Sequence, residues 1–442
     1  MSKRILLVLF AFLLFDSRRA DAYGGISFQK LENGVSVVFI DTVKSNSLLV
    51  VLCVSSGSAD ELDKEGVANL LTYIFMEKLQ ANANADTLQH GSEINSYTEH
   101  DQSLYYFYGN LESLESFLKN LGTVFTKFSF SENDLRNNKR KIEEKLLMDN
   151  QIDKILVKKE SRKSVYWHSR YGADISGNLD SLKNISERDI LNFKNKNYTN
   201  NRATLIIAGD IKKDEAAAMI IKYFGKGEQK SVIDRLQEPP HHRSTTKIMK
   251  SSQQVGVPIV EFYWKIPNYR TEKMKALSVE IFVNYLEETL KKILVDEQKV
   301  AALISYYYSF WNYDSGVFSI TATLRNSNCI EESINAILSE IKYIAFEGIT
   351  KEQADDSVKR IVSSSKKSMF FQKAIFNEKT LDIIEWISRR IGSGNEFDFI
   401  KGYPDFVKKY DLEDVNVQAK AIFKNDPCVI SVIKPVEIKN AG

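Results

Sequence analysis

Histidine, the side chain that most often binds zinc and moves protons near neutral pH, is rare and scattered in this chain. None of the five histidines belongs to an H-x-x-E-H pattern or to its reverse. We also find no G-x-S-x-G turn, no phosphate-cradling glycine loop and no Cys/His metal signature. The residues that could do chemistry therefore form no complete catalytic set by type and spacing. The histidines are His90, His100, His168, His241 and His242.

The segment from residue 56 to residue 73 carries a resemblance to a known family. SGS (residues 56–58) follows an apolar strand, Glu61 stands in the polar loop after it, and GVANLLTY (residues 66–73) opens a helix. This order resembles the catalytic segment of the pitrilysin (insulinase) family of zinc peptidases, which includes the mitochondrial processing peptidases. The family's helix carries G-x-A-H-x-x-E-H, so the resemblance places Asn69 and Tyr73 at the two histidines and Thr72 at the glutamate.

The chemistry that the family motif supplies depends on side chains that this helix lacks. Residues i and i+4 project from one helix face, so two histidines there can hold zinc while a glutamate between them activates bound water. The resemblance puts a third ligand, a glutamate in the family, at Glu144 or Lys145. An amide and a phenol are poor zinc ligands, and a threonine hydroxyl is no base near neutral pH. We expect no bound zinc, no other cofactor and a packed helix here, with Glu144 as the one possible remnant.

Further segments resemble the family in the same order along the chain. The stretch from His90 to Tyr105 is similar to an edge strand beside which the family binds peptide, and the resemblance implies substrate contacts by Asn95, Thr98 and Asp101. Residues 171–185 and 202–210 are similar to the closing part of the family's first domain. Two features are absent: Val295 and Ala302 replace an Arg and Tyr pair, and residues 284–289 contain no glycine.

The resemblance implies a non-catalytic homologue with one of three functions. The first hypothesis is a partner subunit that forms a heterodimer with a motif-bearing relative and helps it bind peptide, because family chains pair around a peptide chamber. The second is a stand-alone peptide-binding or scaffold protein, as a homodimer or with an unrelated partner. The third is an active metallopeptidase whose ligands are not recognised. Peptide is the expected ligand in the first two hypotheses.

Composition and targeting signals narrow the class of protein further. The net charge is +2, from 60 basic and 58 acidic residues, so the sequence has no broad electrostatic footprint for nucleic acid. Residues 1–22 combine a basic start, an apolar run of eleven residues and the small-residue site Ala20-Asp21-Ala22, which predicts a signal peptide and export to the periplasm or medium. An uncleaved membrane anchor is the minor alternative. The three cysteines give no even disulfide framework, and we expect buried thiols.

The elements that position these residues repeat along the chain. Strands are predicted at 34–41, 48–55, 103–109 and 203–208, with residues 42–47 as a hairpin loop and helices at 65–79, 111–128, 132–150 and 187–197. A similar order recurs at an offset of roughly 210 to 230 positions. We therefore predict an α+β fold of two tandem homologous domains, each a mainly antiparallel sheet packed with helices. The domains are 23–226 and 248–442, and 227–247, which contains Pro239-Pro240, is the linker.

Overall fold

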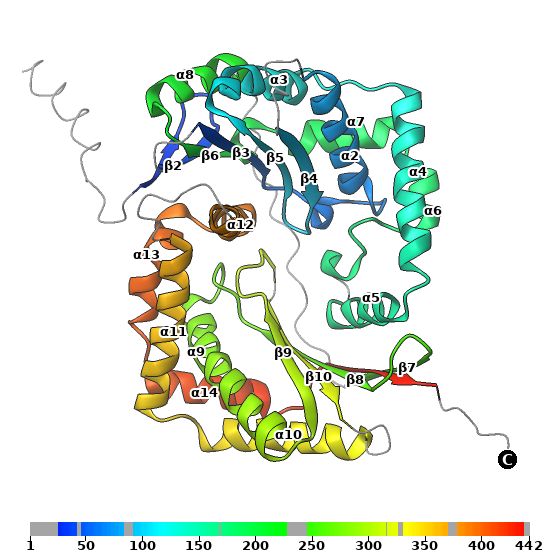
Figure 1. The fold of residues 1–442 in the computed structure, drawn as a ribbon, viewed down its shortest axis with the longest axis vertical. Helices are drawn as coiled ribbons and strands as arrows, with labels where there is room; N and C mark the ends of the chain where they lie inside the picture. The colour runs from blue at the N-terminus through cyan, green and yellow to red at the C-terminus, as the bar shows by residue number, and fades with distance from the viewer. Residues whose placement is uncertain are drawn as a thin grey trace, which may run out of the picture.

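The computed structural model of this chain describes residues 25–41, 46–83, 92–167, 169–227, 245–314, 316–325, 330–369 and 378–436. They form two sheets, each backed by helices, and Figure 1 shows the two sheets one above the other. Each sheet is mainly antiparallel, so the predicted α+β fold with two similar domains is confirmed. The predicted signal segment, residues 1–22, and linker residues 228–244 lie outside the described residues.

In the first half, six described strands pair in the order β1-β2-β6-β3-β5-β4. The strands are β1 (Ile26–Lys30), β2 (Ser36–Asp41), β3 (Ser47–Val54), β4 (Glu93–Thr98), β5 (Ser103–Asn110) and β6 (Ala203–Gly209). The helices are α2 (Val67–Ala81), α3 (Leu114–Thr126), α4 (Glu132–Asp149), α5 (Asp153–Val165), α6 (Leu179–Asn184), α7 (Glu187–Asn197) and α8 (Lys213–Phe224).

In the second half, five described strands pair in the order β7-β11-β8-β10-β9. The strands are β7 (Thr246–Ser252), β8 (Ile259–Ile266), β9 (Ala301–Tyr308), β10 (Gly316–Leu324) and β11 (Val429–Pro435). The helices are α9 (Lys273–Leu290), α10 (Ile330–Glu347), α11 (Lys351–Met369), α12 (Glu378–Gly392), α13 (Phe397–Val407) and α14 (Leu412–Phe423). Because β7 starts at Thr246, the last two residues of the predicted linker belong to the second sheet; the domain limits themselves stay a prediction.

The two sheets share one topology. The order β2-β6-β3-β5-β4 matches β7-β11-β8-β10-β9, and each sheet has a single parallel pair among its described strands, β2 with β6 and β7 with β11. The predicted repeat is therefore visible strand by strand. The hairpin expected between the first two predicted strands is wrong, because β6 lies between β2 and β3 and pairs with both. Four of the expected loop residues, 42–45, lie outside the described residues.

Helix starts follow from short polar motifs in the sequence. At the start of α4, the Ser131 hydroxyl accepts a hydrogen bond from the Asp134 N–H at 3.2 Å, and the Asp134 carboxylate accepts one from the Ser131 N–H at 2.6 Å. Ser186 and Asp189 form the same reciprocal pair at the start of α7. Such capping boxes satisfy N–H groups that a helix start otherwise leaves open. They define where α4 and α7 begin.

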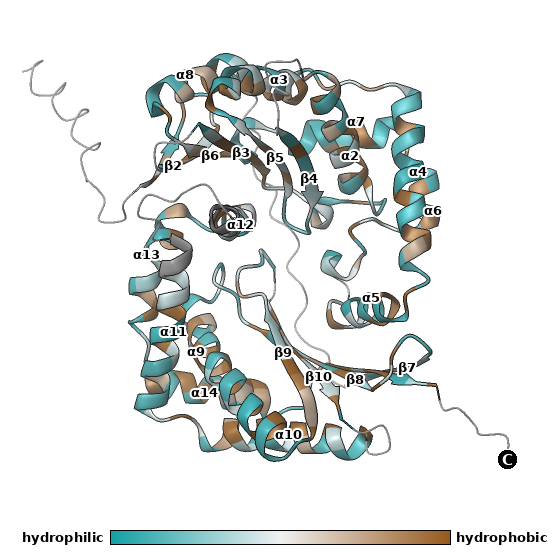
Figure 2. Cartoon of the chain, in the orientation of Figure 1, coloured by the Kyte–Doolittle hydropathy of each residue, from teal (hydrophilic) through white to brown (hydrophobic). Residues whose placement is uncertain are grey.

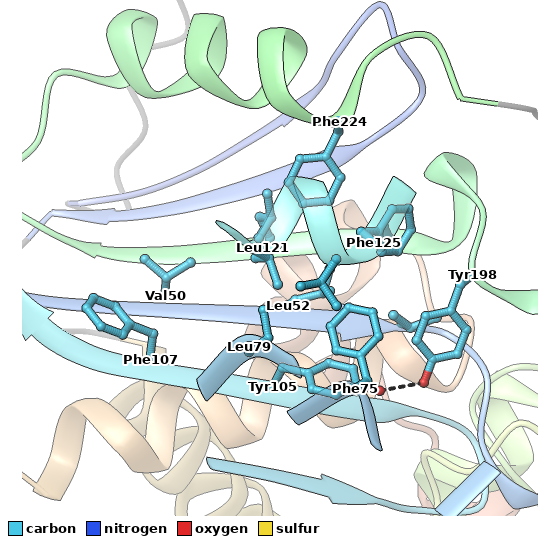
Figure 3. Packing of buried hydrophobic residues seen from close by; sticks show 14 of the residues in the cluster. Val50, Leu52, Phe75, Leu79, Tyr105, Phe107, Leu121, Phe125, Tyr198 and Phe224 are labelled. Atoms are coloured by element: carbon cyan, nitrogen blue, oxygen red, sulfur yellow. Dashed lines mark hydrogen bonds between the residues drawn. The ribbon is translucent and has the colours of Figure 1, made fainter. Parts of the chain in front are cut away.

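The first core lies between the first sheet and helices α2, α3, α7 and α8. Figure 3 shows its aromatic side chains, with Phe75 of α2 against Tyr105 of β5 and Tyr198 after α7. Figure 2 shows the corresponding hydropathy, with apolar residues on the strands and mainly hydrophilic ones along the outer helix α4. None of the described helices combines the length and the hydropathy that a bilayer span requires.

The two halves exchange one helix each. The second half's α12 packs on the outer face of the first sheet, where Ile384 and Ile387 meet Val51 and Ile206. The first half's α5 packs on the outer face of the second sheet, where Val157 and its neighbours meet β7 and β11. Figure 1 shows both helices between the sheets, with α12 under the first and α5 above the edge of the second. Each sheet is thus completed by a helix that is remote in sequence.

Candidate functional site

The loop before α2 holds this helix at its first turn. Glu61 is buried, and its carboxylate accepts hydrogen bonds from the Gly66 N–H at 2.9 Å and the Ala68 N–H at 2.8 Å. Gly66 has φ 92°, a left-handed conformation that favours glycine, and a Cβ there would lie 2.7 Å from the Ser176 carbonyl oxygen. Burial raises the pKa of Glu61 to about 8, although its two backbone donors favour the carboxylate. Glu61 therefore caps the helix that carries Asn69, Thr72 and Tyr73.

Thr72 lies inside the first core with all its hydrogen-bonding capacity used. Its side chain is fully buried, its hydroxyl donates to the Ala68 carbonyl at 2.9 Å, and it accepts from Thr98 at 2.8 Å and from Tyr105 at 3.4 Å. A hydroxyl has one donor and two acceptor positions, so this set is complete. The Tyr105 and Tyr198 hydroxyls, 2.7 Å apart, extend the cluster, as the dashed line in Figure 3 shows. No position at Thr72 is left for activating a water molecule.

The Asn69 side chain and the Lys145 ammonium approach the same hydroxyl group, that of Ser176. The Asn69 amide donates to the Ser176 hydroxyl over 3.5 Å, and the Lys145 ammonium donates to the same oxygen over 3.4 Å. Glu144 points elsewhere: its side chain is 62% exposed and forms an ion pair of 3.8 Å with Arg140. Of the two residues considered for the third ligand, Lys145 is thus the one whose side chain reaches the Asn69 cluster. A protonated lysine has no lone pair to give a metal.

The donors gathered at this end of α2 do not suit zinc. They are an amide, hydroxyls and an ammonium, whereas zinc in proteins takes thiolate, imidazole or carboxylate. Tyr73 is half-buried and packs against the first core. Within the described ranges, no group of three or more His, Cys, Asp and Glu residues could hold a metal ion. His100 lies apart from α2's ligand positions and pairs through Nδ1 with the Ser58 hydroxyl at 2.8 Å, while His90, His168, His241 and His242 lie outside the described residues.

The stretch that resembles a peptide-binding edge is an edge in this structure. β4 is the last described strand of the first sheet and pairs on one side with β5. Asn95 is exposed on β4, and its side-chain oxygen accepts from the Ser96 N–H at 2.8 Å. Thr98 instead turns into the core and donates to Thr72. Of the two, only Asn95 is accessible to a ligand on this strand.

Asp101 joins the two halves of the chain. It is 5% exposed and accepts hydrogen bonds from the Tyr171 hydroxyl in the first half. From the second half it accepts the Tyr313 N–H at 3.0 Å and the Ser393 hydroxyl at 3.1 Å. Sequence reasoning gave Asp101 a substrate contact and missed this role, because no sequence signal links it to residues more than 200 positions away. Tyr171 was singled out by the resemblance, and it belongs to the same junction.

The other residues singled out from the sequence are Val295, Ala302 and the three cysteines. Val295 is partly buried against the second core, in a π-helical turn that continues α9, and Ala302 is exposed on β9. Cys53 is fully buried and donates to the Gln102 side-chain oxygen at 3.2 Å, and burial raises the pKa of its thiol. Cys428 is half-buried with a thiol pKa of about 11, and Cys329 lies outside the described residues. The expectation of buried thiols holds for Cys53.

Comparison with known proteins places these features in a family. Residues 36–176 match the model described as insulinase (peptidase family M16), and residues 184–361 match the model described as peptidase M16 inactive domain. An uncharacterised zinc protease of Bacillus subtilis is 20% identical over 76% of this chain and 83% of its own. The mitochondrial-processing peptidase subunit beta of Saccharomyces cerevisiae is 23% identical over 72% and 73%. The solved peptidase M16 inactive domain of Pseudomonas fluorescens has a TM-score of 0.77 at 15% identity, over 93% of this chain and 98% of its own.

Proposed function

The chain belongs to the insulinase family of M16 peptidases, and from this premise we propose that it is a non-catalytic member that binds extended peptide as the partner subunit of a motif-bearing relative. The first part of the proposal concerns catalysis. A peptidase of this kind needs imidazole and carboxylate ligands and a base beside the metal. The resemblance assigns those positions to Asn69, Thr72 and Tyr73 on the helix, and Lys145 faces Asn69 through Ser176.

The buried hydrogen-bond set of Thr72 carries this proposal. Thr72 is 0% exposed and donates and accepts at all three of its hydrogen-bonding positions, so none is left for a water molecule. A carboxylate in its place would be buried without a cation in contact, which is costly. This filled environment supports the proposal that the helix has no catalytic base at this position.

Peptide binding needs none of those groups. A sheet edge presents unpaired N–H and C=O groups, and an extended peptide can pair with them as an added strand. β4 supplies such an edge, with Asn95 accessible on it. The chain thus has an exposed sheet edge that could bind peptide, next to a helix without catalytic groups. This combination favours peptide binding over peptide cleavage.

The partner and the location complete the proposal. The Saccharomyces relative is named as a subunit, which supports function within an assembly. We propose a heterodimer with a relative that carries H-x-x-E-H, in the periplasm or medium as residues 1–22 suggest. A homodimer or a stand-alone scaffold would instead give a chain that purifies without such a relative.

Metal analysis tests the non-catalytic assignment. The purified full chain should contain no stoichiometric zinc and show no chelator-sensitive peptide cleavage; finding both would overturn the proposal. The partner is tested separately, by affinity purification from the native cell. Recovery of a motif-bearing relative at stoichiometric amounts supports the heterodimer, and a monomer or homodimer without one contradicts it.

Rebuilding the ligand set tests the placement of the site. The threefold variant Asn69→His, Tyr73→His and Lys145→Glu should bind zinc in calorimetric titration, because it restores two imidazoles and the third carboxylate without burying a charge at Thr72. The matched control keeps Lys145 and makes the other two changes. Equal, measurable zinc affinity of the two folded variants would mean that Glu144, not residue 145, faces the metal, and no affinity in either would mean that the site is misplaced.

A further inference from the structure

A cavity of about 790 Å³ lies between the two halves of the chain. Its wall includes residues that directly follow β4, side chains of α5 and α12, and the outer face of the second sheet. This volume falls within the range of about 300–1,000 Å³ that is usual for ligand sites in proteins. The cavity is separate from the Asn69 and Thr72 cluster, none of whose residues line it.

The cavity exists because α5 covers only part of the second sheet. α5 packs on β7, β11 and β8, and the same face continues uncovered along β10 and β9. The uncovered face is polar where the other face of these strands is apolar. Glu261 and Tyr263 of β8, Ser319 and Thr321 of β10 and Tyr307 of β9 line the cavity.

The four carboxylates in the cavity wall already form ion pairs or hydrogen bonds with other groups of the chain. Glu99 forms an ion pair with Arg389 at 3.1 Å, and Asp101 is held by the junction described above. Glu261 accepts from Tyr263 at 2.8 Å and more distantly from Thr321 and Ser431. Glu280 accepts from the hydroxyls of Tyr269 and Tyr403.

Three of the five cationic side chains in the wall also have partners within the chain, through ion pairs, hydrogen bonds or aromatic rings. Arg389 contacts Glu385 at 2.7 Å as well as Glu99. Arg360 donates to the Asn284 side-chain oxygen at 2.9 Å. The Arg390 guanidinium lies over Trp386 and Trp311, with its centre 3.7 and 4.3 Å from the two ring centroids. These groups hold the wall together.

Lys158 and Arg162 are different from the other three. They stand four positions apart on α5, so they project from one helix face, and both line the cavity. Neither has an ion pair or a side-chain hydrogen bond among the described residues. The Arg162 charge acts on Tyr263 and Tyr307, where it opposes the rise that burial causes in each pKa. Among the described residues, the cavity therefore presents two cations that neither an ion pair nor a side-chain hydrogen bond engages, next to tyrosine rings.

We propose that this cavity binds a carboxylate of a peptide, with Lys158 and Arg162 holding the charge and the tyrosines forming the walls. The inference rests on the proposed peptide-binding function and adds the chemistry that the peptide must carry. The carboxylate is either the peptide's C-terminus or an acidic side chain. Four acidic groups in the wall favour a single negative charge over a polyphosphate. A strand added along β4 would have one end beside Glu99 and His100, at the rim of the cavity.

Titration calorimetry of the full chain tests this with three acetylated peptides of one neutral, Tyr-containing sequence. One ends in a free carboxylate, one in an amide, and one in an amide after a Glu at the last position. We expect the first or the third to bind about 10- to 100-fold more tightly than the plain amide, as befits charge-assisted hydrogen bonds. Whichever of the two binds identifies the source of the carboxylate.

The cation pair is tested by the double variant Lys158→Gln and Arg162→Gln, which should reduce the affinity to that of the plain amide. Lys154→Gln is the matched control, an exposed lysine one turn earlier on α5 that does not line the cavity. The control should bind like the wild type, and Arg162→Lys should keep most of the affinity. Equal binding of all three peptides overturns the carboxylate site and leaves peptide binding intact. Binding of none of them overturns both.

Discussion

The outer faces of the two sheets have the same strand order and opposite surroundings. On the first sheet this face is apolar and closed, because α12 covers Val51 and Ile206 with Ile384 and Ile387. On the second sheet α5 covers β7 and β11 in a similar way, but the rest of the matching face carries Glu261, Ser319 and Thr321 and opens into the cavity. The same topology thus gives a packed interface in one half and a polar wall in the other. Side chains at alternate strand positions, and not the fold, decide between the two outcomes.

The strand sequences already contain this difference. β3 reads SLLVVLCV, apolar at consecutive positions, and is buried on both faces. β8, its counterpart in the second sheet, reads IVEFYWKI, in which Val260, Phe262 and Trp264 alternate with Glu261 and Tyr263. A strand that is apolar at consecutive positions must be packed against other elements on both faces of the sheet. A strand in which apolar and polar residues alternate must be packed on one face only. The repeat of the fold therefore leaves each half free to differ on its outer face.

The largest effect is expected where the closed face is broken. Ile387→Ala removes a side chain that is 1% exposed between α12 and the first sheet, and should lower the free energy of unfolding by about 2–4 kcal/mol. Equilibrium denaturation in guanidinium measures it. A cost below about 1 kcal/mol would show that α12 is loosely held and that the two faces are less different than the structure indicates.

A somewhat smaller effect is expected at the junction between the faces. Asp101→Ala leaves the Tyr171 hydroxyl and the Tyr313 N–H without this acceptor, while the Ser393 hydroxyl keeps the Arg389 carbonyl at 2.8 Å. The loss should cost about 2–3 kcal/mol. The same denaturation experiment gives the value. As a control, Asn95→Ala on exposed β4 should change stability by less than about 0.5 kcal/mol. Equal effects of the two substitutions would contradict the junction role of Asp101.

In the cavity wall, the buried Glu280 should make stability depend on pH. Burial raises its pKa, while the Tyr269 and Tyr403 hydroxyls and the Arg390 charge oppose the rise. Because the folded state holds this proton more tightly than the unfolded state, the contribution is present below the unfolded pKa of about 4.3 and is lost as pH rises through the folded pKa. Glu280→Gln keeps an acceptor for both tyrosines and should remove this pH dependence.

Denaturation of wild type and Glu280→Gln at several pH values, from about 4 upward, provides the comparison. The two curves should converge at the acidic end and separate as pH rises, with the variant the more stable. If the free energies of unfolding of the two proteins changed with pH in parallel, the Glu280 carboxylate would be as well solvated in the folded state as in the unfolded state.

The smallest effect is expected on the open face itself. Thr321→Val conserves volume and removes a hydroxyl whose hydrogen bond to Glu261 is long, at 3.4 Å, so stability should change by less than about 0.5 kcal/mol. Thermal unfolding measures the difference. A loss of 2 kcal/mol or more would mean that the cavity wall is as tightly determined as the closed face.

Much of this architecture could be predicted from the sequence because it depends on local periodicity. The helix predicted at 187–197 begins and ends at the observed residues, and the repeat predicted by order and offset appears in the two strand orders. The placement of Asn69, Thr72 and Tyr73 along one helix also follows from spacing alone. These features need only the i, i+4 and alternating patterns that a sequence displays directly.

The remainder depends on contacts between distant residues. The hairpin expected at 42–47 was wrong because β6, from the end of the first half, pairs between β2 and β3. The choice between Glu144 and Lys145 required the rotation of α4 against α2, which a shift of one residue changes. Asp101 is held by Tyr313 and Ser393, and only the folded chain brings them together. No pattern within a short window carries that information.

The exchange of helices has a consequence for synthesis on the ribosome. The first sheet is complete in sequence when β6 ends at Gly209, but α12, which covers its outer face, begins only at Glu378. At about 5–20 residues per second, the intervening stretch takes roughly 10 to 35 seconds to emerge. During that interval Val51, Ile206 and their neighbours remain uncovered. The nascent first half is therefore a natural client for a chaperone that binds apolar strands, until the second half arrives with its helix.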